Sequence, residues 1–115
     1  MKNYRIAITL LVLTSAVHAQ GVIGGDRQSM QEEAYNTYFR CIGVYAGRYI
    51  KSEALVADVA DAAMSACQDR YQDLVNATST LLGTLPAANA VLKDTRETAR
   101  SFAVRTLLEA RFPQR

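Results

Sequence analysis

Apolar and polar residues recur along this chain with helical periods, and three stretches each carry one apolar stripe. From Ser29 onward, apolar or aromatic residues follow one another at intervals of three and four, which indicates a helix. Ser29 and Glu32 form a capping-box pattern, so we expect the first helix to begin at Ser29. Its stripe contains Ala34, Tyr38, Cys41, Tyr45 and Tyr49.

A second stripe follows a polar turn near residue 51. Ser52 is a suitable N-cap for a helix that begins there, and Gly83 is a suitable stop. Several inner positions are alanine, so a neighbouring helix can approach closely; Gly43 and Gly47 of the first helix predict the same. The inner positions are Val56, Ala60, Ala63, Cys67, Tyr71 and Leu74.

A third helix is predicted from Pro86 to Arg111. Proline is tolerated in a first helical turn, and Pro113 terminates the pattern. The third stripe contains Ala88, Leu92, Thr95, Ala99, Phe102, Thr106 and Ala110. No segment shows the alternation and β-branched enrichment of a strand. The sequence therefore predicts an all-α fold, a small bundle of three main helices.

The first nineteen residues read as a secretory signal peptide. Lys2 and Arg5 precede an apolar run from Ile6 to Leu13, and Val17-His18-Ala19 fits a cleavage site. The run is shorter than the ~20 residues that span a bilayer, so no transmembrane segment is expected after cleavage. We predict a signal peptide at 1–19, a flexible tail at 20–28 and one helical domain at 29–115, in the periplasm or secreted.

Cys41 and Cys67 are the only cysteines, and each lies on the apolar side of a predicted helix. Two cysteines in an exported chain most often pair, so we predict a disulfide between the first and second helices. A symmetric hairpin would offset them by about six residues, or ~9 Å along the axis, whereas a disulfide needs Cα atoms within ~7 Å. Either the first helix runs past Ile50, or the helices cross steeply, or the loop is uneven. Cys41 and the segment from Ala60 to Cys67 together resemble small exported helical proteins of Gram-negative bacteria with one cysteine pair.

Charge narrows the range of partners. Removal of Lys2 and Arg5 lowers the basic count from 13 to 11, which equals the 11 acidic residues. The resulting net charge near zero does not support a nucleic-acid partner. The predicted second helix is acidic and the third is basic, which favours an arrangement in which they lie side by side.

Catalysis is not expected. His18 is the only histidine and leaves with the signal peptide, so Ser-His-Asp and Cys-His catalysis are excluded. Two thiols without an imidazole do not make a zinc site. Asp58 and Asp61 share a helix face and leave a hydrolase as a disfavoured alternative. We predict no catalytic residues, no metal site and no cofactor.

Tyrosine and arginine are the most suggestive surface residues, because both are enriched where proteins bind one another. The predicted partner-binding surface contains Tyr35, Tyr38, Tyr45, Tyr49, Arg96 and Arg100. We therefore predict a non-enzymatic protein that binds a protein partner in the bacterial envelope, as an inhibitor or immunity protein does. A small periplasmic stress chaperone is the alternative, and a homodimer remains open.

Overall fold

The computed structural model describes the backbone of residues 4–113 and the side chains of residues 25–113. Four helices form within this part: α1 (Tyr4–Gly47), α2 (Val56–Ala66), α3 (Gln68–Leu82) and α4 (Leu85–Arg111). No strand occurs within residues 4–113, so the all-α prediction is confirmed. The prediction of three main helices is wrong, because the predicted second helix is divided into α2 and α3.

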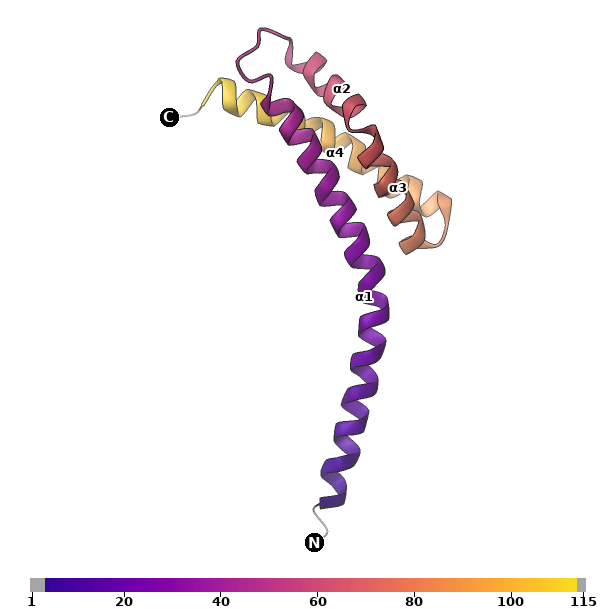
Figure 1. The fold of residues 1–115 in the computed structure, drawn as a ribbon. Helices are drawn as coiled ribbons and strands as arrows, with labels where there is room; N and C mark the ends of the chain where they lie inside the picture. Colours follow the sequence, from indigo (N-terminus) through magenta and orange to yellow (C-terminus); the bar gives the residue numbers. More distant parts are fainter. Residues whose placement is uncertain (1–3, 114–115) are drawn as a thin grey trace.

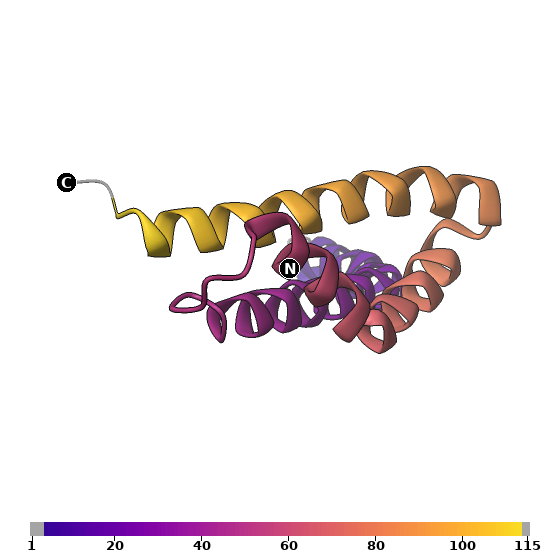
Figure 2. The ribbon, with the colours of Figure 1, turned by 90° about the horizontal axis from the view of Figure 1, so that it is seen from above.

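The N-terminal part of α1 extends beyond the other helices, whereas its C-terminal part packs against all three (Figure 1). α3 runs back along α1, and α4 lies across the others (Figure 2). The predicted tail, residues 20–28, and the predicted helix start at Ser29 both fall within α1. The side chains of the predicted signal peptide lie outside the described ones, and its cleavage remains a prediction. No helix in the described part combines the length and hydropathy needed to cross a bilayer.

The core of the bundle is built largely from small residues. Ala60 and Ala63 of α2 and Ala99 and Ala103 of α4 are fully buried, which confirms the predicted close approach of neighbouring helices. A methyl group at position 43 would lie 3.3 Å from Cε1 of Phe102 in α4, so Gly43 also permits a close approach. The close approach predicted at Gly47 is wrong, because a methyl group there would meet no atom of a neighbouring helix within 4 Å.

The most buried line along α1 differs from the predicted stripe. Tyr38, Ile42 and Ala46 are buried, whereas Tyr45 and Tyr49 keep part of their surface. The reason is that α1 is covered from two sides. Ala46 packs with Val59 of α2 and Leu107 of α4 in addition to the contacts that α1 makes with α3.

The disulfide forms as predicted, and it lies where the second predicted helix is interrupted. Cys41 and Cys67 are bonded, with their Cα atoms 5.9 Å apart. Cys67 separates α2 from α3 and has φ −97° and ψ 16°. The bridge therefore joins α1 to the junction of α2 and α3. The prediction had placed Cys67 within one continuous second helix.

An uneven loop resolves the predicted mismatch between the two cysteines. α1 ends at Gly47 and α2 begins only at Val56. The intervening loop rises beyond the end of α1 before α2 turns back (Figure 1). Ser52, the predicted N-cap, lies inside this loop, where its Oγ accepts a hydrogen bond from the backbone N–H of Ala54 at 3.1 Å.

The boundary between α3 and α4 agrees with the sequence. Gly83 adopts a left-handed conformation, with φ 75°, and its N–H donates to the carbonyl of Ser79, so it ends α3 as predicted. α4 then begins at Leu85, one residue before the predicted start, and ends at Arg111 as predicted.

Arg111 holds the loop between α1 and α2, a contact that the sequence analysis missed. Its guanidinium donates hydrogen bonds to the carbonyls of Tyr49 at 2.7 Å, Ala54 at 2.8 Å and Ile50 at 3.1 Å. Tyr49 and Ile50 lie two and three residues after the end of α1, and Ala54 lies two residues before the start of α2. One side chain at the end of α4 therefore fixes a loop about sixty residues earlier in the sequence.

We expect Arg111→Ala to lower the free energy of unfolding by about 2 kcal/mol, because three carbonyls lose a charged donor. Arg111→Lys keeps the charge but not the planar fork of donors, so it should recover only part of the loss. Urea unfolding of both variants measures these differences. Arg105→Ala, at an exposed arginine on the same helix, is the matched control. Equal stability of Arg111→Ala and Arg105→Ala would show that the loop does not depend on this contact.

Candidate partner-binding site

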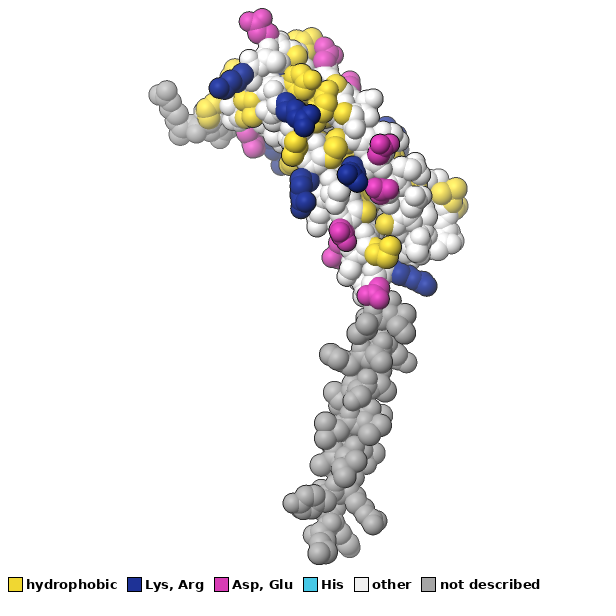
Figure 3. Space-filling view, in the orientation of Figure 1, with side chains coloured by type: hydrophobic (Ala, Val, Ile, Leu, Met, Phe, Trp, Pro, Cys, Tyr) yellow, Lys and Arg dark blue, Asp and Glu magenta, His cyan; other side chains and the backbone are white. Residues whose placement is uncertain are grey.

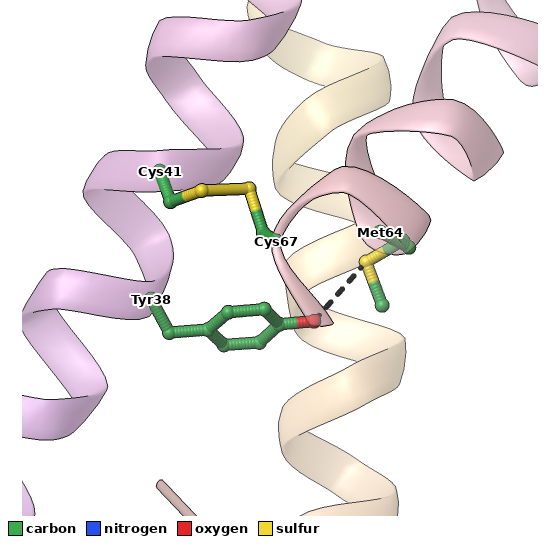
Figure 4. Close-up of a disulfide and its surroundings, with 4 residues drawn as sticks. All are labelled: Tyr38, Cys41, Met64 and Cys67. Atoms are coloured by element: carbon green, nitrogen blue, oxygen red, sulfur yellow. Dashed lines mark hydrogen bonds between the residues drawn. A yellow bond between two sulfur atoms is a disulfide. The ribbon is translucent and has the colours of Figure 1, made fainter. Parts of the chain in front are cut away.

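The four tyrosines of the predicted surface do not lie together. Tyr38 is only 1% exposed, and its hydroxyl donates to Sδ of Met64 at 3.3 Å, next to the disulfide (Figure 4). Tyr35 is half-buried and stacks on Phe39, with ring centroids 4.4 Å apart. Tyr38 therefore presents almost no surface to a partner and belongs to the core.

Tyr45 and Tyr49 form a separate pair at the C-terminal end of α1. Their ring centroids are 5.2 Å apart, and their hydroxyl oxygens are 3.4 Å apart. The hydrogen bond with Tyr49 raises the pKa of Tyr45, and Arg48 opposes that rise. Tyr45 also lines a hollow together with Arg40, Arg48 and Arg70, so this part of the surface is positively charged.

The burial of Tyr38 has a consequence for its ionisation. Burial raises the pKa of its hydroxyl above the ordinary value of 10.0, while Arg96 opposes this rise and Tyr71 adds to it. Arg96 lies over the ring of Tyr71, 5.2 Å from its centroid, and the ring centroids of Tyr71 and Tyr38 are 5.5 Å apart. Arg96, which was predicted to lie on the binding surface, therefore contacts the core through Tyr71.

Arg96 and Arg100 line a hollow between α2 and α4, of about 480 Å³, which we call the α2–α4 groove. Arg100 Nε donates to Oδ1 of Asp61 at 2.9 Å, the kind of contact expected from the opposite charges of the two predicted helices. Met64 and Glu97 also line this groove. The structure thus brings together the two arginines of the predicted surface, in a groove that Tyr35, Tyr45 and Tyr49 do not line.

A second surface lies on the outer face of α1 and α3, and Tyr45 is the one residue of the predicted partner-binding surface that lines it. A basic hollow of about 510 Å³ is lined by Arg40, Val44, Arg48 and Arg70, together with Cys41 and Tyr45. An acidic hollow of about 400 Å³ is lined by Met30, Glu33 and Asp73. Thr37 and Arg70 line both, so the hollows form one continuous α1–α3 groove.

Charge changes along this groove. On the face shown in Figure 3, basic side chains border hydrophobic ones over the C-terminal part of α1, and acidic side chains follow toward its N-terminal side, where a basic side chain lies beside the last of them. The signal in the sequence is a second stripe at helical spacing, on the side of α1 opposite the buried residues Tyr38, Ile42 and Ala46. It was missed because the sequence analysis followed only the apolar and aromatic positions of this helix.

Comparison with known proteins does not assign this chain to a family. No protein-family model, no curated protein and no solved structure matches this chain. Within the described part of the chain, no three histidine, cysteine, aspartate or glutamate side chains converge to hold a metal ion.

We expect the stability of the protein to fall above about pH 10, because the folded state ionises Tyr38 less readily than the unfolded chain. This contribution is fully present below the ordinary tyrosine pKa and is lost as pH rises through the raised value. Tyr38→Phe should cost about 1 kcal/mol at neutral pH by removing the bond to Met64.

The same variant should also lose less stability than the wild type between about pH 9 and about pH 11, as measured by denaturant unfolding at each pH. Tyr35→Phe removes a hydroxyl from a half-buried ring on the same helix and serves as the control. If wild type and Tyr38→Phe lose the same stability over this range, Tyr38 is not the group responsible.

Proposed function

We propose that this chain is exported, folds around its disulfide and acts by binding another protein in the bacterial envelope through the α2–α4 groove. The disulfide is consistent with an oxidising compartment, and the predicted signal peptide supports export. The observation that carries the proposal is the groove itself, where Arg96 and Arg100 lie side by side with Met64.

The chemistry of this groove suits a polypeptide. Arg96 and Arg100 offer planar donors that bind carboxylates in a bidentate manner, while Asp61 and Glu97 can accept from a basic side chain. Met64 is flexible and adapts to apolar side chains of varied shape. A partner that presents acidic, basic and apolar side chains matches this mixture better than a small ligand of one charge.

The scaffold makes such binding inexpensive in entropy. Arg96 is held over Tyr71, and Arg100 is held by Asp61, so both guanidinium groups are partly ordered before a partner arrives. Preordered side chains reduce the entropy lost on association. A binding protein of this kind, with a groove on a disulfide-fixed bundle, can act as an inhibitor or immunity protein of an envelope enzyme or toxin.

A second candidate function is that of a small stress chaperone. Leu55 is 69% exposed and Phe112 is 71% exposed. Leu55 follows Ala54 in the sequence, and Phe112 follows Arg111. Because Arg111 donates a hydrogen bond to the carbonyl of Ala54, the two apolar residues lie at the same end of the bundle. Exposed apolar side chains that lie near one another favour contact with partly unfolded clients.

We expect the immobilised protein to capture one dominant partner from an extract of the envelope fraction of its native host. Arg96→Glu with Arg100→Glu should reduce its recovery at least about tenfold, since central arginines often dominate binding energy. Lys93→Glu with Arg105→Glu, at exposed positions on the same helix, imposes the same change in charge and is the control. Quantitative mass spectrometry of the eluates measures recovery, after melting curves establish that each bait is folded.

Two results would contradict the proposal. Equal recovery by all three baits would remove the α2–α4 groove from the binding surface. Recovery of many unrelated proteins, with no dominant species, would favour the chaperone. In that case Leu55→Ser with Phe112→Ser should reduce the suppression of aggregation of unrelated client proteins.

A further inference from the structure

The outer face of α1 carries exposed residues at helical spacing that no described helix covers. Met30 is 60% exposed and Val44 is 54% exposed. Among the described side chains of α1, these are the most exposed large hydrophobic residues. Charged residues alternate with them at steps of three and four, as on one side of a helix. All members of the stripe except the half-buried Thr37 are exposed: Asp26, Met30, Glu33, Thr37, Arg40, Val44 and Arg48.

This stripe is self-complementary about its centre. Val44 lies seven residues after Thr37, and Met30 lies seven residues before it, so each is about 10 Å from the centre along the axis. Arg48 lies eleven residues after Thr37, and Asp26 lies eleven before it.

Arg40 and Glu33 lie three residues after and four residues before the same centre. A second α1, antiparallel and centred on Thr37, would therefore place apolar residues against apolar residues and each arginine near an acid.

α3 extends the same arrangement. The basic and acidic hollows lie on opposite sides of Thr37 and Arg70, which line both. At such a centre the two Arg70 side chains would approach each other, but Asp73 lies 3.8 Å from Arg70 and can offset their repulsion. Behind this face the disulfide holds α1 to the start of α3, so the groove is ordered before association.

We propose that the α1–α3 groove is the interface of a symmetric homodimer, in which α1 of one copy lies antiparallel on α1 of the other with the two-fold axis near Thr37. A two-fold interface brings the same patch of both copies together, so a patch with opposite charges on either side of the axis is suited to it. The α2–α4 groove uses different residues and stays available to another protein.

The change of charge along the groove favours a second copy over other occupants. A bilayer of anionic lipids or a nucleic-acid backbone carries negative charge throughout and would meet Glu33 and Asp73 as well as the arginines. A purely acidic partner segment would match only the basic hollow. A second copy presents both signs of charge at matching positions.

The experiment is a charge exchange followed by sedimentation velocity on the exported, oxidised protein. The wild type should be a dimer whose dissociation constant rises with salt, because exposed ion pairs are screened. One variant, Arg40→Glu with Arg48→Glu, should weaken the dimer at least about tenfold, and so should a second, Asp26→Arg with Glu33→Arg. A 1:1 mixture of these two variants, or all four changes in one chain, should restore dimerisation.

Lys93→Glu with Arg105→Glu alters the net charge as much as the first variant does and should leave the dimer intact. A wild type that stays monomeric at about 100 µM, at low ionic strength, would overturn the proposal. So would a dimer that survives either charge reversal, or one that mixing fails to restore. Melting curves of the variants separate loss of association from loss of folding, and restoration on mixing requires that both variants are folded.

Discussion

The disulfide between Cys41 and Cys67 is the constraint on which the rest of the structure depends. It ties the C-terminal part of α1 to the point where α2 gives way to α3. The core around it is rich in alanine, and each buried alanine contributes little transfer free energy. Closing a loop with a separation of 26 residues is worth about 3.5 kcal/mol in the chain-entropy model. A small domain has about 5–15 kcal/mol in total, so the bridge is a large share.

Much of the fold could be predicted from local sequence. Pro86 placed the start of α4 to within one residue, and Gly83 marked the end of α3. The oxidising compartment implied by the predicted signal peptide favoured pairing of the two cysteines, and they are bonded. These features depend on residues close in sequence or on chemistry that holds anywhere in a chain.

The features that escaped prediction depend on contacts distant in sequence. Nothing between Val56 and Leu82 is glycine or proline, so no local signal marks the interruption at Cys67. Arg111 looks like an ordinary basic residue in a last helical turn until the loop before α2 is placed beside it. Tyr38 and Tyr45 share one helix, yet α3 and α4 bury the first and leave the second at the edge. For the same reason the predicted binding residues were separated, and Arg96 and Arg100 alone were brought to one groove.

Holding α1 against α3 also determines which faces of the bundle remain uncovered. One is the α1–α3 groove, with opposite charges on either side of Thr37. The other is the α2–α4 groove, where α2 is positioned by the same bridge at its C-terminal end. Both proposals, of a symmetric dimer and of a protein partner, therefore assume that the bridge is closed when the protein acts.

The most direct test of this account is thermal unfolding with and without reductant, combined with alkylation of the folded protein. We predict that neither cysteine is alkylated before reduction and that peptide mapping finds Cys41 linked to Cys67. Reduction should lower the melting temperature by on the order of 15 °C, the shift expected for a loss of about 3.5 kcal/mol in a domain of this size. An unchanged melting temperature, with both thiols alkylated in the folded protein, would contradict the account.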